Sequence, residues 1–488
     1  MALCTQGCDI MGKNIPFCFF ASFVILIFIL NPLHVTGESL THSSEGYLPL
    51  QATAAILVEQ TTGRVLYSRN PHARMYPAST TKLLTALVAI QHLDLDTVVV
   101  VGPEIRGMPV GFATNLHAES ETITVDVLLK ALLIRSSNEA GRILAIETVR
   151  TIDDNRSLQY SEAKTRFSQL MNQMAHSLGA TNSNFNNPYG LHSEFHYTTA
   201  YDMALIGRAF MEVPELVGIS AIREFEGDSL GNRFHPQAYV RQYSWTNTNL
   251  MLPGAAFGHP YIIAGRTGFT TPAGHCFVGG AYHNGLSLVS VVLYSQEPAR
   301  WQDTRVLIDH GFINYAFREI ATEGTLLATA IVENPRLGDS NTLEVLLQER
   351  HVALLGRAEY ASIQRELVFD PLLLVEAYTG IAHDAESVIL RAPIEEGAAV
   401  GTVVYKVFGE IIFSTPAIAA RAVYERTFDS DMDYYLSMIF GNIFTRRALP
   451  YWFAVLGTLF GVVNLILAIT ISRRARRLNN WHTPPRRR

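Results

Sequence analysis

An uncharged stretch of 23 residues near the C-terminus, Leu449–Ile471, most constrains what this chain can form. A helix of that length spans about 34 Å, which is enough to cross the hydrocarbon core of a bilayer. Tyr451 and Trp452 lie at its start, where an aromatic belt belongs. Four arginines follow within residues 473–477, against two before it at 446–447. The positive-inside rule therefore predicts a single-pass helix, a cytoplasmic tail (472–488) and a body outside the cytoplasm.

The N-terminal end of the chain predicts the same location. Phe17–Leu30 is apolar apart from Ser22, follows Lys13, and is followed by Val35-Thr36-Gly37. This order fits a secretory signal peptide, residues 1–37, that is cleaved after about Gly37. The segment is short for a membrane span, although an uncleaved anchor is the alternative. The body is therefore expected to be tethered outside the cytoplasmic membrane, in a periplasm or at a cell surface.

Charge and cysteine content exclude several protein classes. Seven of the 38 Lys and Arg are arginines within 473–488, so the rest of the chain holds 31 basic residues against all 44 acidic ones. An acidic body argues against nucleic acid as the partner, because phosphate binding needs clustered cations. Cys4, Cys8 and Cys18 fall in the N-terminal segment, which leaves Cys276 alone in the body. One thiol excludes a disulfide scaffold, and we interpret Cys276 as a buried strand residue.

Residues 38–320 predict an α/β (α+β) domain with a sheet covered by helices. Ala52–Glu59 and Arg64–Ser68 predict a first hairpin, and the Asn284-Gly285 turn predicts a late one. Helical periodicity dominates between them, and we expect the first strand to rejoin the late ones. The expected helices are Thr80–Leu93, Val125–Ile134, Glu139–Thr148, Ser161–Leu178 and, after the late hairpin of Cys276–Tyr282 and Leu286–Ser295, Arg305–Phe317.

Residues 321–427 have a different sequence pattern, which predicts a small β-rich domain. Short apolar runs alternate there with turn-like stretches such as Glu395-Glu396-Gly397. Residues 428–448 are then expected to link this domain to the transmembrane helix, 449–471. The runs expected as strands are Thr325–Val332, Thr342–Leu347, Ser387–Arg391 and Ala399–Val407.

The first candidate motif is Ser79-Thr80-Thr81-Lys82, at the start of an apolar helix. Unpaired N–H groups at a helix N-terminus favour developing negative charge beside Ser79. Lys82 lies three residues on, so it shares a helix face with Ser79. Burial among leucines should lower the lysine pKa, and the neutral amine could then take the serine proton. The alternative is an N-cap serine with a surface lysine; Ser161–Lys164 has the same spacing in a polar stretch.

Two further motifs follow in order. Ser136-Ser137-Asn138 comes after an apolar helix, where a loop can offer a hydroxyl for proton relay and an amide for a substrate peptide group. Arg266-Thr267-Gly268 precedes the Cys276 strand; its cation and hydroxyl could hold a carboxylate, and glycine permits close approach of a substrate backbone. The backbone N–H of Phe269, with that of Ser79, could form an oxyanion hole. Taken singly, an inter-helix turn and a strand end explain these motifs.

Together and in this order, the three motifs resemble those of the low-molecular-mass penicillin-binding proteins, the serine-type D-alanyl-D-alanine carboxypeptidases, whose motifs are Ser-x-x-Lys, Ser-x-Asn and Lys-Thr-Gly. The likeness covers about residues 47–320 and extends to part of the β-rich domain. Further similar segments are Thr62–Tyr67, Asn187–Leu191, Thr199–Asp202, Ala273–Cys276 and Pro393–Tyr405. A C-terminal membrane anchor is also common in that family.

The resemblance implies a role for each motif residue. Ser79 would attack the carbonyl between the terminal D-alanines of a peptidoglycan stem peptide, with Lys82 as general base. Ser136 would relay protons, and Asn138 would position the substrate amide. Arg266 and Thr267 would bind the terminal carboxylate, water would hydrolyse the acyl-enzyme, and β-lactam antibiotics would acylate Ser79. No cofactor or metal is expected.

Arg266 departs from the family pattern, which usually has lysine. Arginine keeps the charge and can pair bidentately with a carboxylate, but it is bulkier and does not give up its proton. Two other functions stay open. A serine β-lactamase shares all three motifs, although we find no Glu-x-x-Leu-Asn segment after the second motif. A penicillin-binding sensor without activity is supported by Arg266 alone. His192 and His196, four residues apart, could suggest a metal site, although Pro188 and Gly190 indicate a loop.

Overall fold

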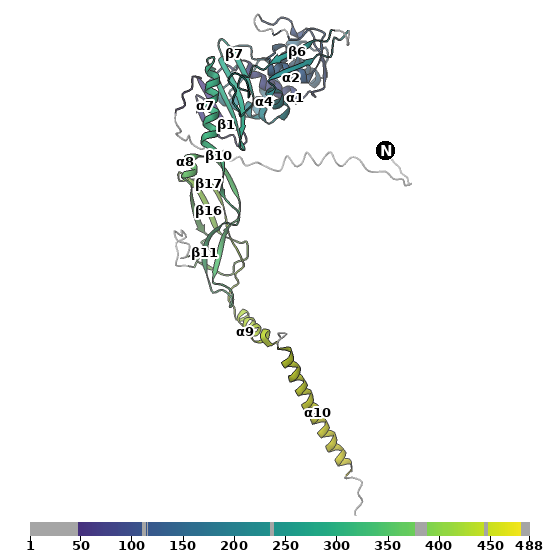
Figure 1. The fold of residues 1–488 in the computed structure, drawn as a ribbon, viewed down its shortest axis with the longest axis vertical. Helices are drawn as coiled ribbons and strands as arrows, with labels where there is room; N and C mark the ends of the chain where they lie inside the picture. Colours follow the sequence, from purple (N-terminus) through teal and green to yellow (C-terminus); the bar gives the residue numbers. More distant parts are fainter. Residues whose placement is uncertain are drawn as a thin grey trace, which may run out of the picture. The chain divides into compact units, whose positions relative to one another are not determined.

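The computed structural model describes residues 47–109, 114, 116–234, 239–375, 388–443 and 448–479. The expected signal peptide, residues 1–37, and the end of the basic tail, 480–488, lie outside the described residues. Figure 1 shows the described elements along the chain.

A five-stranded sheet forms the centre of the first part of the chain, in the order β2-β1-β9-β8-β7. The first strand pairs antiparallel with β9, so that Ile56 faces Val291, as expected from the sequence. Strand β7 lies at one edge of the sheet and carries the third motif. The strands are β1 (Ala54–Glu59), β2 (Val65–Arg69), β7 (Ile262–Thr270), β8 (Gly274–His283) and β9 (Leu286–Ser295).

Helices cover both faces of this sheet. In α5 (Ala200–Met211), Gly207 lies against Val278 and Val289, and in α7 (Ala299–Asn314), Gly311 lies against Leu57 and Leu288. Neighbouring strand residues such as 288 and 289 point to opposite faces, so the two helices lie on opposite sides. Together with α1 (Lys82–Ile90), the helices on the α5 side form one large apolar core.

The remaining helices and short strands complete this part of the chain. Thr124 and Ser137 accept backbone hydrogen bonds at the starts of α2 and α3, as N-cap residues do. The elements are a 3₁₀ turn η1 (Ala78–Thr81), β3 (Val98–Val100), η2 (Pro103–Ile105), β4 (Thr122–Thr124), α2 (Val125–Ile134), α3 (Asn138–Ile152), α4 (Tyr160–Ser177), α6 (Pro214–Ala221), β5 (Glu224–Asp228) and β6 (Gln242–Thr246). Strands β3 and β4 pair with each other, as do β5 and β6.

The later part of the chain is β-rich, as expected, and has its own apolar core. Its six-stranded sheet has the order β14-β16-β17-β12-β11-β15, and β10 pairs separately with β13. The elements are β10 (Tyr315–Ala321), β11 (Leu326–Glu333), β12 (Thr342–Leu347), β13 (His351–Gly356), α8 (Arg357–Ala361), β14 (Gln364–Phe369), β15 (Ile389–Arg391), β16 (Ala399–Val407) and β17 (Glu410–Ala419).

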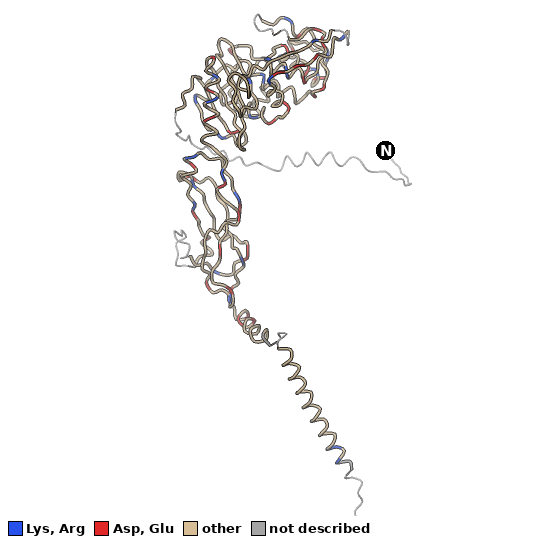
Figure 2. The backbone as a smooth tube through the Cα atoms, in the orientation of Figure 1, with Lys and Arg blue, Asp and Glu red and all other residues tan. Residues whose placement is uncertain are grey.

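Two helices follow the β-rich part. The segment expected only as a linker contains α9 (Phe428–Ile443), and α10 (Leu449–Asn479) includes the predicted membrane span. Within the described residues, Leu449–Arg476 is the one helix long and apolar enough to cross a bilayer. Figure 2 shows α10 without charged residues until its C-terminal end, where arginines gather. This helix therefore fits a membrane anchor.

Both bounds of the helix expected at Arg305–Phe317 were predicted wrongly. The helix begins earlier, at Ala299, and it ends at Asn314, because Tyr315 begins strand β10. Tyr315 pairs with Gly356 of β13, a contact between residues far apart in the sequence. The expected helix and strand β10 share residues 315–317. Apolar residues at positions such as Tyr315 and Phe317 fit the period of a helix or of a strand, so the local pattern could not locate the end of the helix.

Candidate active site

Ser79 lies on a tight 3₁₀ turn that leads directly into α1, rather than on the α-helix itself. The preceding Ala78 has a φ of 46°, in the left-handed region that side chains rarely adopt. The Thr81 hydroxyl donates to the Ala78 carbonyl oxygen at 2.7 Å, and the Thr80 hydroxyl donates to that of Pro77 at 2.7 Å. The two threonines of the motif therefore hold the turn that presents Ser79.

His196 contacts this turn through the Thr81 hydroxyl. Its Nδ1 accepts the backbone N–H of Asn186 at 3.0 Å, so Nε2 carries the proton and donates to the Thr81 hydroxyl at 2.9 Å. Burial, followed by the neighbouring His192, lowers the pKa of His196 to about 3, so the ring is neutral. His196 is thus a buried part of the Ser79 turn, which gives this histidine a structural role that the sequence did not reveal.

Lys82 points back at Ser79. Its Nζ lies 2.9 Å from Ser79 Oγ, and the side chain is fully buried. Asn138 Oδ1 and the Tyr189 carbonyl oxygen each accept a hydrogen bond from Nζ at 2.7 Å. Burial lowers the pKa of Lys82 well below its ordinary value, Arg266 lowers it further, and Glu139 opposes both. The Lys82 amine therefore contacts both Ser79 of the first motif and Asn138 of the second, in surroundings that favour its neutral form.

The loop Asn187–Leu191 supplies a part of the site whose role the sequence analysis did not predict. Asn187 Oδ1 accepts the backbone N–H groups of Gly190 and Leu191, at 2.8 and 2.9 Å, and so aims the Tyr189 carbonyl at Lys82. Gly190 has a φ of 86°, and a Cβ there would lie 1.8 Å from the Ala78 carbonyl oxygen. Only glycine allows this close approach to the Ser79 turn.

The second motif begins in a left-handed residue. Ser136 has a φ of 64° and is partly buried, and its hydroxyl makes no hydrogen bond in the described part of the chain. Ser137 caps α3 by accepting the Ala140 N–H at 3.1 Å. Asn138 is the first residue of that helix, which carries its amide oxygen to Lys82. Within the described residues the Ser136 hydroxyl thus has no hydrogen-bond partner, whereas the Asn138 amide oxygen already accepts a hydrogen bond from Lys82.

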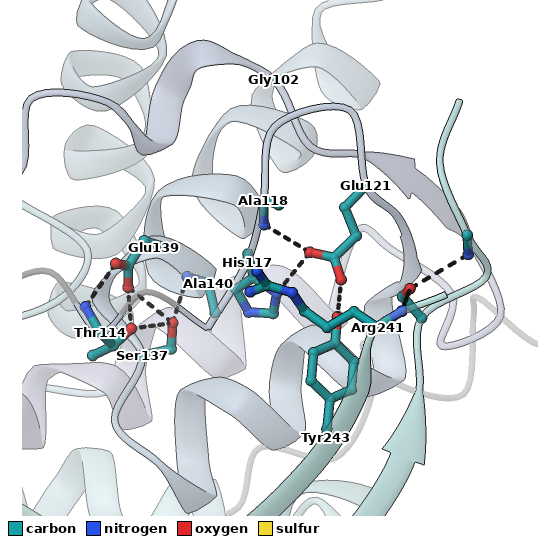
Figure 3. A network of polar contacts seen from close by, with 12 residues as sticks. Gly102, Thr114, His117, Ala118, Glu121, Ser137, Glu139, Ala140, Arg241 and Tyr243 are labelled. Carbon is teal, nitrogen blue, oxygen red and sulfur yellow. Dashed lines mark hydrogen bonds and ion pairs between the residues drawn. The ribbon is translucent and has the colours of Figure 1, made fainter. Parts of the chain in front are cut away.

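Figure 3 shows polar contacts around Glu139, at the second motif, and around Glu121, beside strand β6. Glu139 accepts the Thr114 N–H at 2.7 Å and the Ser137 hydroxyl at 3.2 Å. Glu121 accepts the Ala118 N–H at 2.9 Å and also the Tyr243 hydroxyl from β6. The two carboxylates therefore already have partners within the protein.

Arg266 and Thr267 of the third motif both contact Thr248. Arg266 Nη1 donates to the Leu133 carbonyl oxygen at 2.6 Å and to Thr248 Oγ1 at 3.1 Å, and Thr267 Oγ1 lies 3.2 Å from Thr248 Oγ1. Arg266 is only 1% exposed, and burial, followed by Arg300, lowers its pKa to about 9. Its charge therefore acts from inside the wall of the site, and Thr267 beside it is buried as well.

Gly268 brings the edge strand β7 against the Ser79 turn. A Cβ at this position would lie 2.8 Å from the Pro77 carbonyl oxygen and 3.1 Å from the Ser79 nitrogen. The glycine thus allows close packing within the protein, in addition to any approach by substrate. Phe269 follows it with a half-exposed ring packed on His275, their centroids 4.4 Å apart. The structure therefore brings all three motifs to one place, around Ser79 and Lys82.

Comparison with known sequences agrees with this arrangement. The sequence model of a peptidase family described as D-alanyl-D-alanine carboxypeptidase matches residues 41–297, just over half of the chain. The chain belongs to this family. The match includes all three motifs and the loop that carries Tyr189, so the family assignment covers the whole of the candidate site.

Relatives within the family extend over most of the chain. It is 26% identical over 379 residues to D-alanyl-D-alanine carboxypeptidase DacF of Bacillus subtilis, covering 76% of this chain and 85% of that protein. It is 32% identical over 248 residues to a D-alanyl-D-alanine endopeptidase of Pseudomonas aeruginosa, covering 50% of this chain and 72% of that protein.

Solved structures share the fold. Penicillin-binding protein 5 from Haemophilus influenzae matches with a TM-score of 0.52 and 23% identity, covering 78% of this chain and 100% of that one. The D-alanyl-D-alanine carboxypeptidase DacD from Francisella tularensis matches with a TM-score of 0.55 and 21% identity, covering 81% and 100%. The fold expected from the three motifs is thereby confirmed.

Proposed function

We propose that this protein is a serine-type D-alanyl-D-alanine carboxypeptidase that removes the terminal D-alanine of peptidoglycan stem peptides during cell-wall remodelling. The observation that carries the proposal is the buried Lys82 amine, 2.9 Å from the Ser79 hydroxyl, within a chain of the D-alanyl-D-alanine carboxypeptidase family. A neutral amine at hydrogen-bonding distance is the arrangement that a general base needs.

Acylation would proceed through these two side chains. The neutral Lys82 amine takes the Ser79 proton as Oγ bonds to the carbonyl carbon before the terminal D-alanine. The peptide C–N bond then breaks, and the leaving amine receives a proton that the Ser136 hydroxyl would relay from Lys82. The Ser79 and Phe269 N–H groups would stabilise the oxyanion.

Substrate binding would use the edge of β7 and the two later motifs. Within the described residues β7 is an edge strand, so it can add an extended peptide as a further strand. Asn138 would position the substrate amide, and the Thr267 hydroxyl would bind the terminal carboxylate. Because Arg266 is buried, we assign it the positive potential behind that carboxylate rather than direct bidentate pairing.

Water would complete the cycle by hydrolysing the ester at Ser79, which restores the hydroxyl and releases the shortened peptide. A β-lactam presents a strained amide beside a carboxylate, so the same residues would open its ring and leave an acyl group on Ser79. β-Lactam antibiotics are therefore expected as inhibitors.

The location follows from the two ends of the chain. We propose that residues 1–37 act as a signal peptide, that α10 anchors the protein by one crossing, and that 472–488 lie in the cytoplasm. The support is the apolar helix Leu449–Arg476 and the arginines after it. The catalytic body, residues 38–320, and the β-rich part, 321–427, then face the cell wall.

The test uses the full chain in detergent. We expect covalent labelling by a fluorescent penicillin and release of D-alanine from a pentapeptide that ends in D-Ala-D-Ala, and Ser79→Ala should abolish both. Labelling without any D-alanine release would indicate a sensor. Rapid release of opened penicillin would indicate a β-lactamase, and either result would overturn the proposal.

A further inference from the structure

Thr248 lies between the second and third motifs, and the mechanism proposed above gives it no role. Its hydroxyl accepts hydrogen bonds from Arg266 Nη1 at 3.1 Å and from the Thr267 hydroxyl at 3.2 Å. Its backbone N–H donates at 3.0 Å to the carbonyl oxygen of Ile134, two residues before Ser136. One threonine outside the three motifs therefore contacts the third motif through its side chain and the end of α2 through its backbone.

The proton of the Thr248 hydroxyl is unused within the described residues. A hydroxyl can accept two hydrogen bonds and donate one, and Arg266 and Thr267 supply both of the bonds that Thr248 accepts. In the described part of the chain no acceptor takes the Thr248 proton. Thr248 is partly exposed, whereas Arg266 and Thr267 are only 1% and 7% exposed. The most exposed of these three side chains is thus the one with a free donor.

Arg266 strengthens this donor and adds a buried positive charge. Its guanidinium donates to the Leu133 carbonyl oxygen and to Thr248, and its buried Nε has no partner among the described residues. Burial and a second cation, Arg300, lower the pKa of Arg266 to about 9, so it is charged at neutral pH, and no described carboxylate opposes this shift. A buried charge without an opposite partner is costly, and hydrogen bonds in a chain polarise one another. The arrangement therefore favours an anion at the Thr248 hydroxyl.

The backbone around Thr248 is held by two buried asparagines, Asn247 and Asn249. Asn247 Nδ2 donates to the carbonyl oxygens of Ser220 and Ile222, at 3.1 and 2.8 Å. Its Oδ1 accepts the backbone N–H of Asn249 at 2.8 Å. Because the residues on both sides of Thr248 are fixed, little ordering is needed when its hydroxyl binds a ligand.

The position of Thr248 also fits the length of the substrate. Gly268 packs against the Ser79 turn, and Thr267 precedes it by one residue on β7. In the proposed reaction the terminal carboxylate lies one residue beyond the carbonyl that Ser79 attacks, and an extended chain advances about 3.3 Å per residue. A substrate strand along β7 would therefore bring its carboxylate to the level of Thr267 and Thr248.

We propose that the Thr248 hydroxyl donates a hydrogen bond to the terminal carboxylate of the substrate, and that this bond makes the enzyme prefer a free carboxylate over a carboxamide. The inference rests on the proposed function, since it concerns the same substrate and the same site. The Thr267 hydroxyl can rotate its proton from Thr248 to the carboxylate while both oxygens keep their positions, so the two threonines would share this group. Arg266 supplies the positive potential behind them.

The experiment compares two peptides with the full chain in detergent. Diacetyl-Lys-D-Ala-D-Ala has a free carboxylate, and its C-terminal amide is the same peptide with a neutral end. The wild type should cleave the acid with a higher kcat/KM than the amide. Thr248→Val keeps the shape of the side chain without its hydroxyl and should lower this acid-to-amide ratio roughly tenfold, as expected for one hydrogen bond to a charged group. Thr248→Ser keeps the hydroxyl and should keep most of the ratio.

Thr246→Val provides the control, because Thr246 is an exposed threonine on β6 whose hydroxyl makes no hydrogen bond within the described residues. It should leave the ratio unchanged. Thr248→Ala has a smaller side chain that cannot clash with its neighbours, and it should lower the ratio as much as Thr248→Val. The alanine variant therefore decides the test if the valine variant does not fold.

The outcomes separate this inference from the proposed function. A merely structural role for Thr248 would slow the cleavage of both peptides equally and leave the ratio unchanged. If the wild type cleaves the acid without preferring it to the amide, or if a folded variant without the hydroxyl keeps the wild-type ratio, the assignment of Thr248 is wrong while the proposed function stands. If the wild type releases no D-alanine from the acid, the proposed function itself fails.

Discussion

The carbonyl oxygen of Tyr189 lies 2.7 Å from Lys82 Nζ, within a loop more than a hundred residues from the lysine in sequence. Asn138 accepts a second hydrogen bond from the same nitrogen, and Ser79 lies at the third position. These three oxygens fix the direction of the amine while burial disfavours its charge. The amine proposed as general base is therefore held by groups from three separate segments.

The pH at which acylation becomes fast should depend on the charges of Glu139 and Arg266, which shift the pKa of Lys82 in opposite directions. Acylation needs neutral Lys82, so its rate should rise with pH and level off above the lowered pKa of Lys82. Glu139→Gln removes the charge that raises this pKa, and the rising limb should move to lower pH. Arg266→Met removes the charge that lowers it, and the limb should move to higher pH.

The measurement is the second-order rate of acylation by a fluorescent penicillin across the pH range. Arg266→Lys keeps the positive charge and serves as the control, with the limb close to that of the wild type. Shifts of both charge-removing variants in the same direction would show that another group controls the limb.

Gly190 should be intolerant of a side chain because of both its backbone and its neighbours. Gly190→Ala places a Cβ against the Ala78 carbonyl in a left-handed conformation, and should cost about 3 kcal/mol or more with loss of acylation. Gly285→Ala is the matched control: its φ is 81°, and no atom lies within 4 Å of the new Cβ. Chemical denaturation should show only about 1–2 kcal/mol for that variant. Equal losses would refute the close-approach explanation.

Asn187 should be required to aim the Tyr189 carbonyl. Asn187→Ala leaves the buried N–H groups of Gly190 and Leu191 without their acceptor, which should cost about 2–3 kcal/mol of stability. Acylation should slow as Lys82 loses its direction. Asn187→Asp keeps the acceptor oxygen and should recover part of both losses. If Asn187→Ala leaves the acylation kinetics unchanged, the loop does not orient Lys82 and the prediction is wrong.

The sequence was sufficient for the overall fold and for Ser79 and Lys82 as candidates, because hairpin turns, helical periods and short motifs are local signals. The bounds of α2 and β9 match the expected ranges. The direction of the Tyr189 carbonyl and the support from His196 depend on contacts across the fold, which no local pattern carries. Likewise, the inward orientation of Arg266 depends on Leu133 and Thr248, so its charge could be predicted from the sequence but its position could not.

Cys276 should be unreactive in the folded protein. Its thiol is fully buried, and burial raises its pKa to about 11, so almost no thiolate is available. A chromogenic disulfide reagent should therefore modify it only after denaturation. Rapid reaction in native buffer, with the three N-terminal cysteines replaced by serine, would contradict the buried position.

The central claim is that Lys82 activates Ser79, and the most direct test is the acylation rate of Lys82→Met. A fluorescent penicillin, with the labelled peptide identified by mass spectrometry, measures modification of Ser79 itself. The wild type should be labelled at Ser79, and the variant, with an unchanged circular dichroism spectrum, should be slower by a factor on the order of 10³. Labelling of a folded Lys82→Met protein at the wild-type rate would contradict the claim.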